Sequence, residues 1–313
     1  LMILSSISCS EESEIEPFLG EEPPGMEAVL FAPGVVSTSD HEHSRIEFSP
    51  DGMDIYWAVI PVDTSRLTHH GAPFDVQGQK VWYSSGRDGD WSAPRPLPFD
   101  YTRICCPVMH PSGESLYFRA TRTGPESPEG KSDIFRTSMA GDGTWKAPEV
   151  DAPGPLDPGG MAVRSISFCF SANRNLYFDV YNGDNDRPKW DIWFSEFRDG
   201  SYLEPVLLGG GINTGDVNWT PWVAPDESYI LFSSHRDGNI GNGDIYVSFR
   251  DPDAGWSEPV NLGAKVNTES QERFPSVSPD GRYLFFARMV DSRTFSDIFW
   301  IDAGVIAEAL DAD

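Results

Sequence analysis

The stretch VSPDGRYLFF, residues 277–286, carries the two signals that decide the fold of this chain. Its Ser-Pro-Asp-Gly turn combines a proline of fixed φ, an aspartate that bonds nearby backbone and a glycine that tolerates positive φ. The apolar and aromatic run that follows is typical of a β-strand. Four other stretches have the same form: FSPDGMDIYW (48–57), MHPSGESLYF (109–118), FSANRNLYF (170–178) and VAPDESYILF (223–232).

The five copies also continue alike, with 53 to 61 residues from one turn to the next. A third strand-like run begins with Asp in four copies, and a Trp-x-x-Pro or Tyr-x-x-Pro segment then leads into a fourth. Four short strands repeated in this way are typical of a β-propeller blade. The sequence therefore predicts an all-β chain that folds as a five-bladed β-propeller of four-stranded antiparallel blades.

The fifth copy lacks its fourth strand, and the N-terminal segment is expected to supply it. GMEAVLFAPGVVST (25–38) is similar to WSEPVNLGAKVNT (256–268), which leads into the outer strand of the fourth copy. Closing the ring in this way removes the exposed edge of an open sheet. We expect a tether and linker at 1–24 and a single propeller at 25–313. Its parts are a closing strand at 25–38, blades at about 43–98, 104–152, 165–208, 218–262 and 272–302, and a short helix at 303–310.

With these stretches in view, the chain resembles the TolB-type, WD40-like repeat proteins called PD40. FLGEEPPGMEAVLFAPGVVST (18–38), APDESYILF (224–232) and SDIFWIDAGVIAEAL (296–310) resemble a stand-alone bacterial group of such proteins. The resemblance implies a propeller fold and a location outside the cytoplasm, and it implies no particular activity. The third copy departs from the pattern with SANR at its turn, and the first has Lys80 where the others have Asp, so these blades are expected to be irregular.

Charge narrows the choice of partners. The chain has 49 acidic and 23 basic residues among 313, a formal net charge of −26. An acidic surface of this size repels phosphate backbones and anionic lipids, so nucleic acid is excluded as a partner. The remaining classes are proteins, peptides and glycans, and the oligomeric state is left open.

The N-terminal stretch LMILSSISCSEESEIEP resembles the end of a bacterial lipoprotein signal, with Cys9 as the lipidated residue. This interpretation predicts an extracytoplasmic protein, periplasmic or tethered to the outer membrane through Cys9 alone. The alternative is a frayed terminus. The other cysteines, Cys105, Cys106 and Cys169, are expected to be free thiols because no CxxC pair or disulfide framework is present.

Candidate site residues come from the segments that the repeats do not share. In a propeller the innermost strand of each blade lines a central channel, and the loops that lead into these strands are expected at 40–46, 101–106, 162–167, 216–222 and 270–274. Four of the five contain an arginine, and on so acidic a chain these would make a positive well for carboxylate or phosphate groups. The arginines are Arg45, Arg103, Arg164 and Arg273. The residues expected beside them are Glu42, His43, Asn218, Trp219 and Glu272.

Two other interpretations of these residues remain open. The arginines can instead pair with Glu42, Glu47 and Glu272 to join neighbouring blades. Alternatively, a histidine and carboxylates at the same mouth can serve a polysaccharide hydrolase or lyase.

Metal sites and catalysis have weaker signals. His41 and His43, with His69 and His70 from a loop, could hold a metal, but we predict none there. Oxygen ligands at Asp237, Asn239 and Asp244 could take Ca²⁺, although a glycine-rich loop explains the same residues. No GxSxG elbow is present, and no catalytic residue is assigned. The favoured prediction is a non-catalytic binding protein for a protein, peptide or anionic glycan, with no cofactor.

Overall fold

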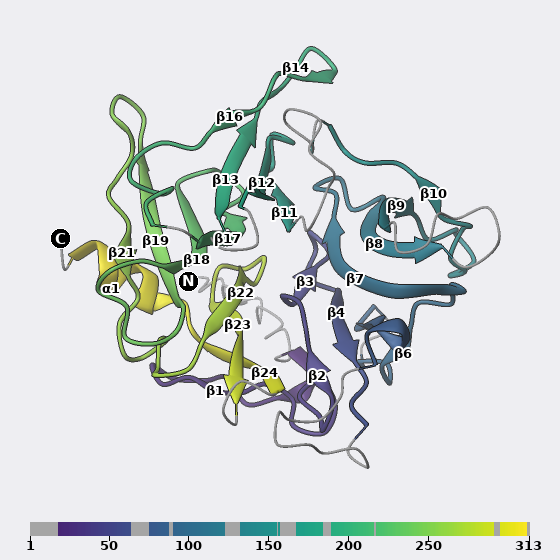
Figure 1. Ribbon diagram of the computed structural model, residues 1–313. Coiled ribbons are helices and arrows are strands. Elements are labelled where there is room, and N and C mark those ends of the chain that lie inside the picture. Colours follow the sequence, from purple (N-terminus) through teal and green to yellow (C-terminus); the bar gives the residue numbers. More distant parts are fainter. Residues whose placement is uncertain are drawn as a thin grey trace, which may run out of the picture.

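The computed structural model describes residues 18–63, 75–87, 90–122, 132–154, 156, 167–183, 189–215, 217–290 and 295–311. Nearly all of the regular secondary structure in this part is β-strand, and the strands form sheets that surround a common centre (Figure 1). The only α-helix in the described residues is α1, Gly304–Asp311, and none of the described helices is long and apolar enough to span a membrane.

The first two sheets are built from consecutive antiparallel strands. In the first, two short strands, β2 (His41–Glu42) and β3 (Glu47–Phe48), both pair with β4 (Asp54–Ile60). The rest of that sheet is β5 (Lys80–Ser85) and β6 (Arg95–Pro96). The second sheet contains β7 (Tyr101–Met109), β8 (Leu116–Arg122), β9 (Ser132–Thr137) and β10 (Glu149–Val150).

The next two groups of strands share one hydrogen-bonded sheet, because a parallel bridge joins Trp190 of β13 to Val217 of β17. The first group is β11 (Phe168–Phe170), β12 (Leu176–Tyr181), β13 (Trp190–Ser195) and β16 (Val206–Leu207). The second group is β17 (Val217–Val223), β18 (Tyr229–His235), β19 (Asp244–Asp251), β20 (Gly255–Trp256) and β21 (Val260–Asn261). A separate hairpin joins β14 (Phe197–Arg198) and β15 (Ser201–Tyr202).

The last sheet combines the two ends of the chain. Strand β1 (Val29–Leu30) pairs antiparallel with β24 (Phe295–Asp302), with Val29 opposite Trp300. The other strands of this sheet are β22 (Glu272–Val277) and β23 (Tyr283–Val290). In the described ranges, the 3₁₀ turn η1 (Phe18–Gly20) precedes the sheets and η3 (Val76–Gly78) lies between β4 and β5.

The repeated turn forms as its residues predict. Ser49 Oγ donates to Asp51 Oδ1 at 2.6 Å, and the same oxygen accepts from the Met53 amide at 3.1 Å. Gly52 closes the turn at φ 71°. In the third and fourth copies Arg174 and Glu227 adopt positive φ at this position without being glycine, so those turns carry backbone strain.

The hydrophobic core lies between neighbouring sheets. Tyr56 and Val81 of the first sheet pack in one cluster with Leu116 and Phe118 of the second. Each sheet has apolar side chains on both faces, because it is covered by the sheet before it and the sheet after it. This explains the near-continuous burial of the seven residues in β4.

The expectation that loops lead into the inner strands is wrong for three copies. Residues 101–106 lie within β7, and β17 and β22 begin at Val217 and Glu272. Cys106, Thr220 and Phe274 have φ of 57°, 50° and 56° next to register shifts in the pairing, which is the geometry of a β-bulge. A proline follows each of them, and proline within a strand is confined to edges and bulges. The strand therefore continues through a segment whose sequence indicates a break.

Candidate functional site

A cavity of about 460 Å³ opens where the inner strands of the first, second and last sheets begin. Three arginines line it, and no acidic residue does so in the described part of the chain. In a protein of charge −26 this is a local concentration of positive charge. The described lining residues are His41, His43, Ile60, Val76, Gln79, Arg103, Cys105, Cys106, Arg119, Ser132, Arg273 and Met289.

Two of the four predicted arginines, Arg103 and Arg273, share this cavity with the predicted His43. The third arginine of the lining, Arg119, was not predicted. It lies on β8 directly opposite Cys105, so the bulged pairing of β7 with β8 turns it to the same side. The predicted residues all belong to segments expected to lead into the innermost strands, whereas Arg119 lies on the second strand of its sheet. Side chains alternate between the two faces of a strand, so Arg119 lies on the same face of β8 as Tyr117, two residues earlier. This alternation is the sequence signal that could have indicated Arg119.

Arg273 forms the wall between the first and last sheets. It is only 8% exposed, and its Nη2 lies 3.3 Å from His41 Nε2 and 3.4 Å from His43 Nδ1. Its Nε has no hydrogen-bond partner among the described residues. Burial lowers the pKa of this guanidinium to about 10, so it remains charged at neutral pH. A buried, incompletely satisfied cation favours the approach of an anion.

The two histidines beside Arg273 are neutral. The Ser296 amide donates to His41 Nδ1 at 3.0 Å, so the proton of neutral His41 is on Nε2, 3.1 Å from His43 Nδ1. Burial, and then the charge of Arg273, lowers the pKa of His41 to about 3 and that of His43 well below its usual value. The facing ring nitrogens bond each other, which is not the arrangement of two ligands around a metal. His69 and His70 lie outside the described residues.

Arg45 does not reach the cavity. It is 3% exposed and lies beside Val108 and Phe274 of the inner strands, where its Nη2 donates to Ser167 Oγ at 2.7 Å. Its Nη1 has no partner among the described residues. Arg164, the fourth predicted arginine, lies outside the described residues.

Asp179 is a second buried polar residue near the inner strands, and it was not predicted. Its two carboxylate oxygens accept from the amides of Ser167 and Thr220, both at 2.8 Å, and so connect the third and fourth groups of strands. Burial raises the pKa of Asp179 to about 7, although both hydrogen bonds oppose this rise. The residue serves as a structural brace between β12 and β17.

Glu42 and Glu272 anchor the chain ahead of the inner strands instead of facing the cavity. Glu42 accepts from the backbone and hydroxyl of Thr38 at 3.2 and 3.0 Å, and Glu272 accepts from Thr268 in the same way at 3.1 and 2.7 Å. In the described part of the chain, Glu272 alone of the two has a cation, Arg288, at 2.8 Å. The expected pairing of Glu272 with an arginine is therefore present, but within one sheet and with an arginine that was not predicted.

Val59 stands opposite Glu42 at the position where Arg288 stands opposite Glu272. The buried carboxyl of Glu42 thus lacks the cation of its counterpart, and burial raises its pKa to about 9. Glu42 is therefore protonated at neutral pH, and a protonated carboxyl can be buried at lower cost than a carboxylate.

Asn218 and Trp219 also lie away from the cavity lining. Asn218 Oδ1 accepts from Ser234 Oγ at 2.9 Å and from Arg236 Nη2 at 3.0 Å. The ring of Trp219 lies 5.9 Å from those of both Trp190 and His235. Both residues thus take part in packing within the third and fourth groups of strands.

The cysteines in the described residues are free thiols, as predicted. Cys105 and Cys106 both line the cavity, with their sulfur atoms 3.0 Å apart. The hydrogen bond from Cys106 lowers the pKa of Cys105 and raises that of Cys106. Cys9 lies outside the described residues, so its lipidation stays a prediction.

The loop proposed for Ca²⁺ is held by its own hydrogen bonds. Both carboxylate oxygens of Asp244 accept backbone amides, from Ile240 at 2.6 Å and Gly241 at 3.0 Å. Asn239 Oδ1 accepts from the Tyr246 hydroxyl at 2.7 Å. These bonds are those expected of an aspartate at a strand start, and calcium binding stays an untested prediction.

Comparisons with known proteins identify the fold type. A scan of protein families and a search of curated proteins both find no match. Among solved structures, a family 117 glycoside hydrolase of the marine bacterium Zobellia galactanivorans aligns with TM-score 0.50 and 15% identity, over 94% of this chain and 91% of that one. A protein of unknown function from Dyadobacter fermentans aligns with TM-score 0.50 and 12% identity, over 90% and 84%.

TolB from Acinetobacter baumannii is also similar, with TM-score 0.47 and 16% identity over 86% of this chain, which spans 59% of the TolB chain. At these identities the likeness concerns the fold alone. Together with the sheets around a common centre, it establishes a β-propeller-type fold. Neither a binding role nor hydrolysis follows from it.

Proposed function

We propose that this protein is a non-catalytic five-bladed propeller of the TolB-like PD40 type, closed by its N-terminal strand, which binds an anionic ligand outside the cytoplasm. The pairing of β1 with β24 supports the closure, because it joins the two ends of the chain in one sheet. The ligand is an acidic segment of a protein or peptide, or an anionic glycan. It binds in the cavity of about 460 Å³ at the start of the inner strands.

The observation that carries this proposal is the convergence of Arg103, Arg119 and Arg273 on a cavity that no described acidic residue lines. Guanidinium groups bind carboxylate, sulfate and phosphate groups through paired hydrogen bonds. Arg273 is already desolvated, so an anion that reaches it replaces little water on the protein side. Each such charged hydrogen bond contributes about 1.5–3 kcal/mol.

Binding is tested by thermal stabilisation with three anionic probes: oligogalacturonate, a sulfated galactan oligosaccharide and tetraglutamate. We expect at least one probe to raise Tm, with a smaller effect at high salt because the contacts are ionic. Arg103→Ala and Arg119→Ala are each expected to weaken binding about tenfold. The matched control is Arg198→Ala, which removes an exposed arginine paired with Glu196 elsewhere on the surface. Unchanged binding in both cavity variants would contradict the proposal.

The alternative is a polysaccharide hydrolase or lyase, which would use a histidine and carboxylates at the same cavity. His43 lines the cavity, whereas Glu42 and Glu272 are bonded to threonines away from it. The same probes decide between the two functions if reducing ends and unsaturated products are measured. Product formation that His43→Ala abolishes would establish the enzyme instead.

A further inference from the structure

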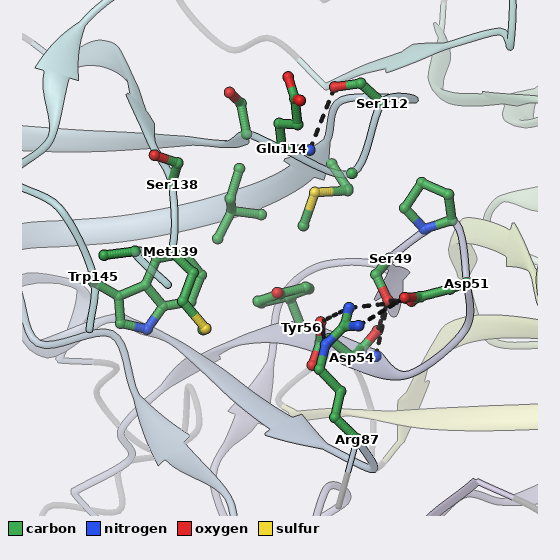
Figure 2. A pocket seen from close by; sticks show the side chains of 16 residues that line it. Ser49, Asp51, Asp54, Tyr56, Arg87, Ser112, Glu114, Ser138, Met139 and Trp145 are labelled. Carbon is green, nitrogen blue, oxygen red and sulfur yellow. Dashed lines mark hydrogen bonds and ion pairs between the residues drawn. The ribbon is translucent and has the colours of Figure 1, made fainter. Parts of the chain in front are cut away.

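A second cavity, of about 440 Å³, lies at the opposite end of the inner strands, in a groove between the first and second sheets. Figure 2 shows Trp145 and Met139 on one side of it, Tyr56 near its middle and Asp51 with Arg87 on the other side. None of these residues lines the proposed anion site. We refer to this cavity as the open groove.

The same place between the last and first sheets is filled by an aromatic side chain of the chain itself. Phe18 lies there, 8% exposed, with its ring 5.1 Å from that of Phe48 and 6.0 Å from that of Trp91. On the other side its ring lies 6.3 Å from Tyr283 and 6.0 Å from Phe285. The propeller therefore uses an inter-sheet groove of this kind to hold a ring.

The open groove is the equivalent of the Phe18 groove, one sheet further along the chain. The counterparts of Phe48 and Trp91 in the next copy are Met109 and Trp145, and both line the open groove. The counterparts of Tyr283 and Phe285 are Asp54 and Tyr56, and these line it as well. Met109 and Asp54 are smaller than Phe48 and Tyr283, their aromatic counterparts in the Phe18 groove, whereas Tyr56 and Trp145 are aromatic like theirs.

Other parts of the chain close the remaining grooves. Val305, Ile306 and Ala309 of α1 pack into one cluster with Leu231 and Val277, between the fourth group of strands and the last sheet. Between the third and fourth groups, Glu227 bonds both Asn175 and Arg250. Between the second sheet and the third group, Leu156 is 3% exposed in a cluster with Tyr117.

The polar rim of the open groove is acidic. Among the described residues, Asp51, Asp54 and Glu114 line it together with one cation, Arg87. Arg87 is already engaged, because it donates to Asp51 at 2.7 Å and to Asp54 at 2.6 Å (Figure 2). Glu114 is exposed at the rim, across the groove from these residues. An occupant that places a positive charge near Glu114 gains an attraction that a neutral one lacks.

We propose that the open groove is a docking site for a partner protein that presents an aromatic side chain beside a basic residue. The aromatic ring enters between Tyr56, Met109 and Trp145, as Phe18 does in the homologous groove. The basic residue lies over Glu114 and the outer edge of Asp51. The site is independent of the arginine cavity, because it lies at the other end of the inner strands.

The test uses the full chain and three dipeptide probes: N-acetyl-Phe-Arg-amide, N-acetyl-Ala-Arg-amide and N-acetyl-Phe-Glu-amide. Binding is followed by NMR through the methyl signals of Met109 and Met139, which both line the groove. We expect the Phe-Arg probe to shift both signals saturably, and the other two to bind more weakly. Glu114→Gln is expected to weaken the Phe-Arg probe about threefold, as for a solvated ion pair.

The matched control is Asp253→Asn, which removes an exposed carboxylate on the β19–β20 turn. It is expected to leave the binding of the Phe-Arg probe unchanged. Equal affinity for the Phe-Arg and Phe-Glu probes, or methyl signals that no probe moves at millimolar concentration, would overturn the proposal. Concentration-dependent dimerisation that Glu114→Gln abolishes would also overturn it, because the occupant would then be a second copy of this chain.

Discussion

The two cavities, of about 460 and 440 Å³, lie at opposite ends of the same inner strands and differ in charge and in origin. The first cavity, near His41, is lined by arginines that are not repeated from one copy to the next. Residues at positions that every copy has line the second, at the repeated turns, and two of them, Asp54 and Met109, are smaller than their aromatic counterparts in the Phe18 groove. A repeat thus makes sites in two ways: by adding unrepeated side chains, or by leaving a repeated position underfilled.

The largest expected effect tests the filled groove against the open one. Phe18→Ala removes a buried ring with four aromatic neighbours, and we expect it to lower the free energy of unfolding by about 3 kcal/mol. Met139→Ala, at a residue 39% exposed in the open groove, is expected to change it by less than about 0.5 kcal/mol. Chemical denaturation measures both. Equal losses would mean that Phe18 does not fill its groove in solution.

The second effect concerns pH at the arginine cavity. The pKa of His41 is 6.5 in the unfolded chain and about 3 in the folded one, so between these values only the unfolded state takes up the proton. The contribution of His41 to stability is therefore complete above pH 6.5 and decreases as the pH falls toward 3, by up to about 1.4 kcal/mol per pH unit.

The comparison of His41→Asn with the parent isolates this contribution, because both asparagine and histidine can accept from the Ser296 amide. The stability of the variant has to be compared with that of the parent because the raised pKa of Glu42 has the opposite effect. It favours the folded state as the pH falls from 9 toward 4.5. We expect the variant to become more stable relative to the parent between pH 6.5 and pH 5 in denaturation curves. A difference that does not change with pH would show that the folded protein protonates this ring normally.

The smallest effect separates the arginines of the two cavities. Arg87→Ala leaves Asp54, 6% exposed, without its cation, and because Arg87 is itself half exposed we expect a loss of about 1 kcal/mol. Arg119→Ala removes one of three like charges around the other cavity, so the unliganded protein is expected to lose nothing or to gain slightly in stability. Thermal melts at low and high salt compare the two. A larger loss for Arg119 would mean that it holds the structure together instead of binding a ligand.

Much of the fold could be predicted because its signals are local. The hydrogen bonds made by Ser49 and Asp51 and the positive φ of Gly52 involve only neighbours in the turn. The Ser-Pro-Asp-Gly sequence therefore predicted them correctly. The strand-rich repeat is of the same kind. The loops expected to lead into the inner strands were wrong for three copies because β-bulges keep those strands continuous, and a bulge depends on the partner strand.

The site could be predicted only in part. Arg103, His43 and Arg273 reach one cavity, as the unrepeated segments indicated. Arg45 lies deeper, and Glu42 is fixed by Thr38. Which of these side chains face the cavity depends on bulges and on hydrogen bonds across the sheets, and neither follows from their order in the chain.

By itself, the sequence determined the number of repeated units, their turns and the acidic character of the surface, because these follow from residues close together in the chain or from composition. Only the tertiary structure decided that Arg119 joins Arg103 and Arg273, and that Phe18 fills one groove while the next is open. The physical reason is that both depend on which segments, far apart in sequence, pack between two sheets. The register between strands and the size of the side chains at the sheet interfaces control that packing.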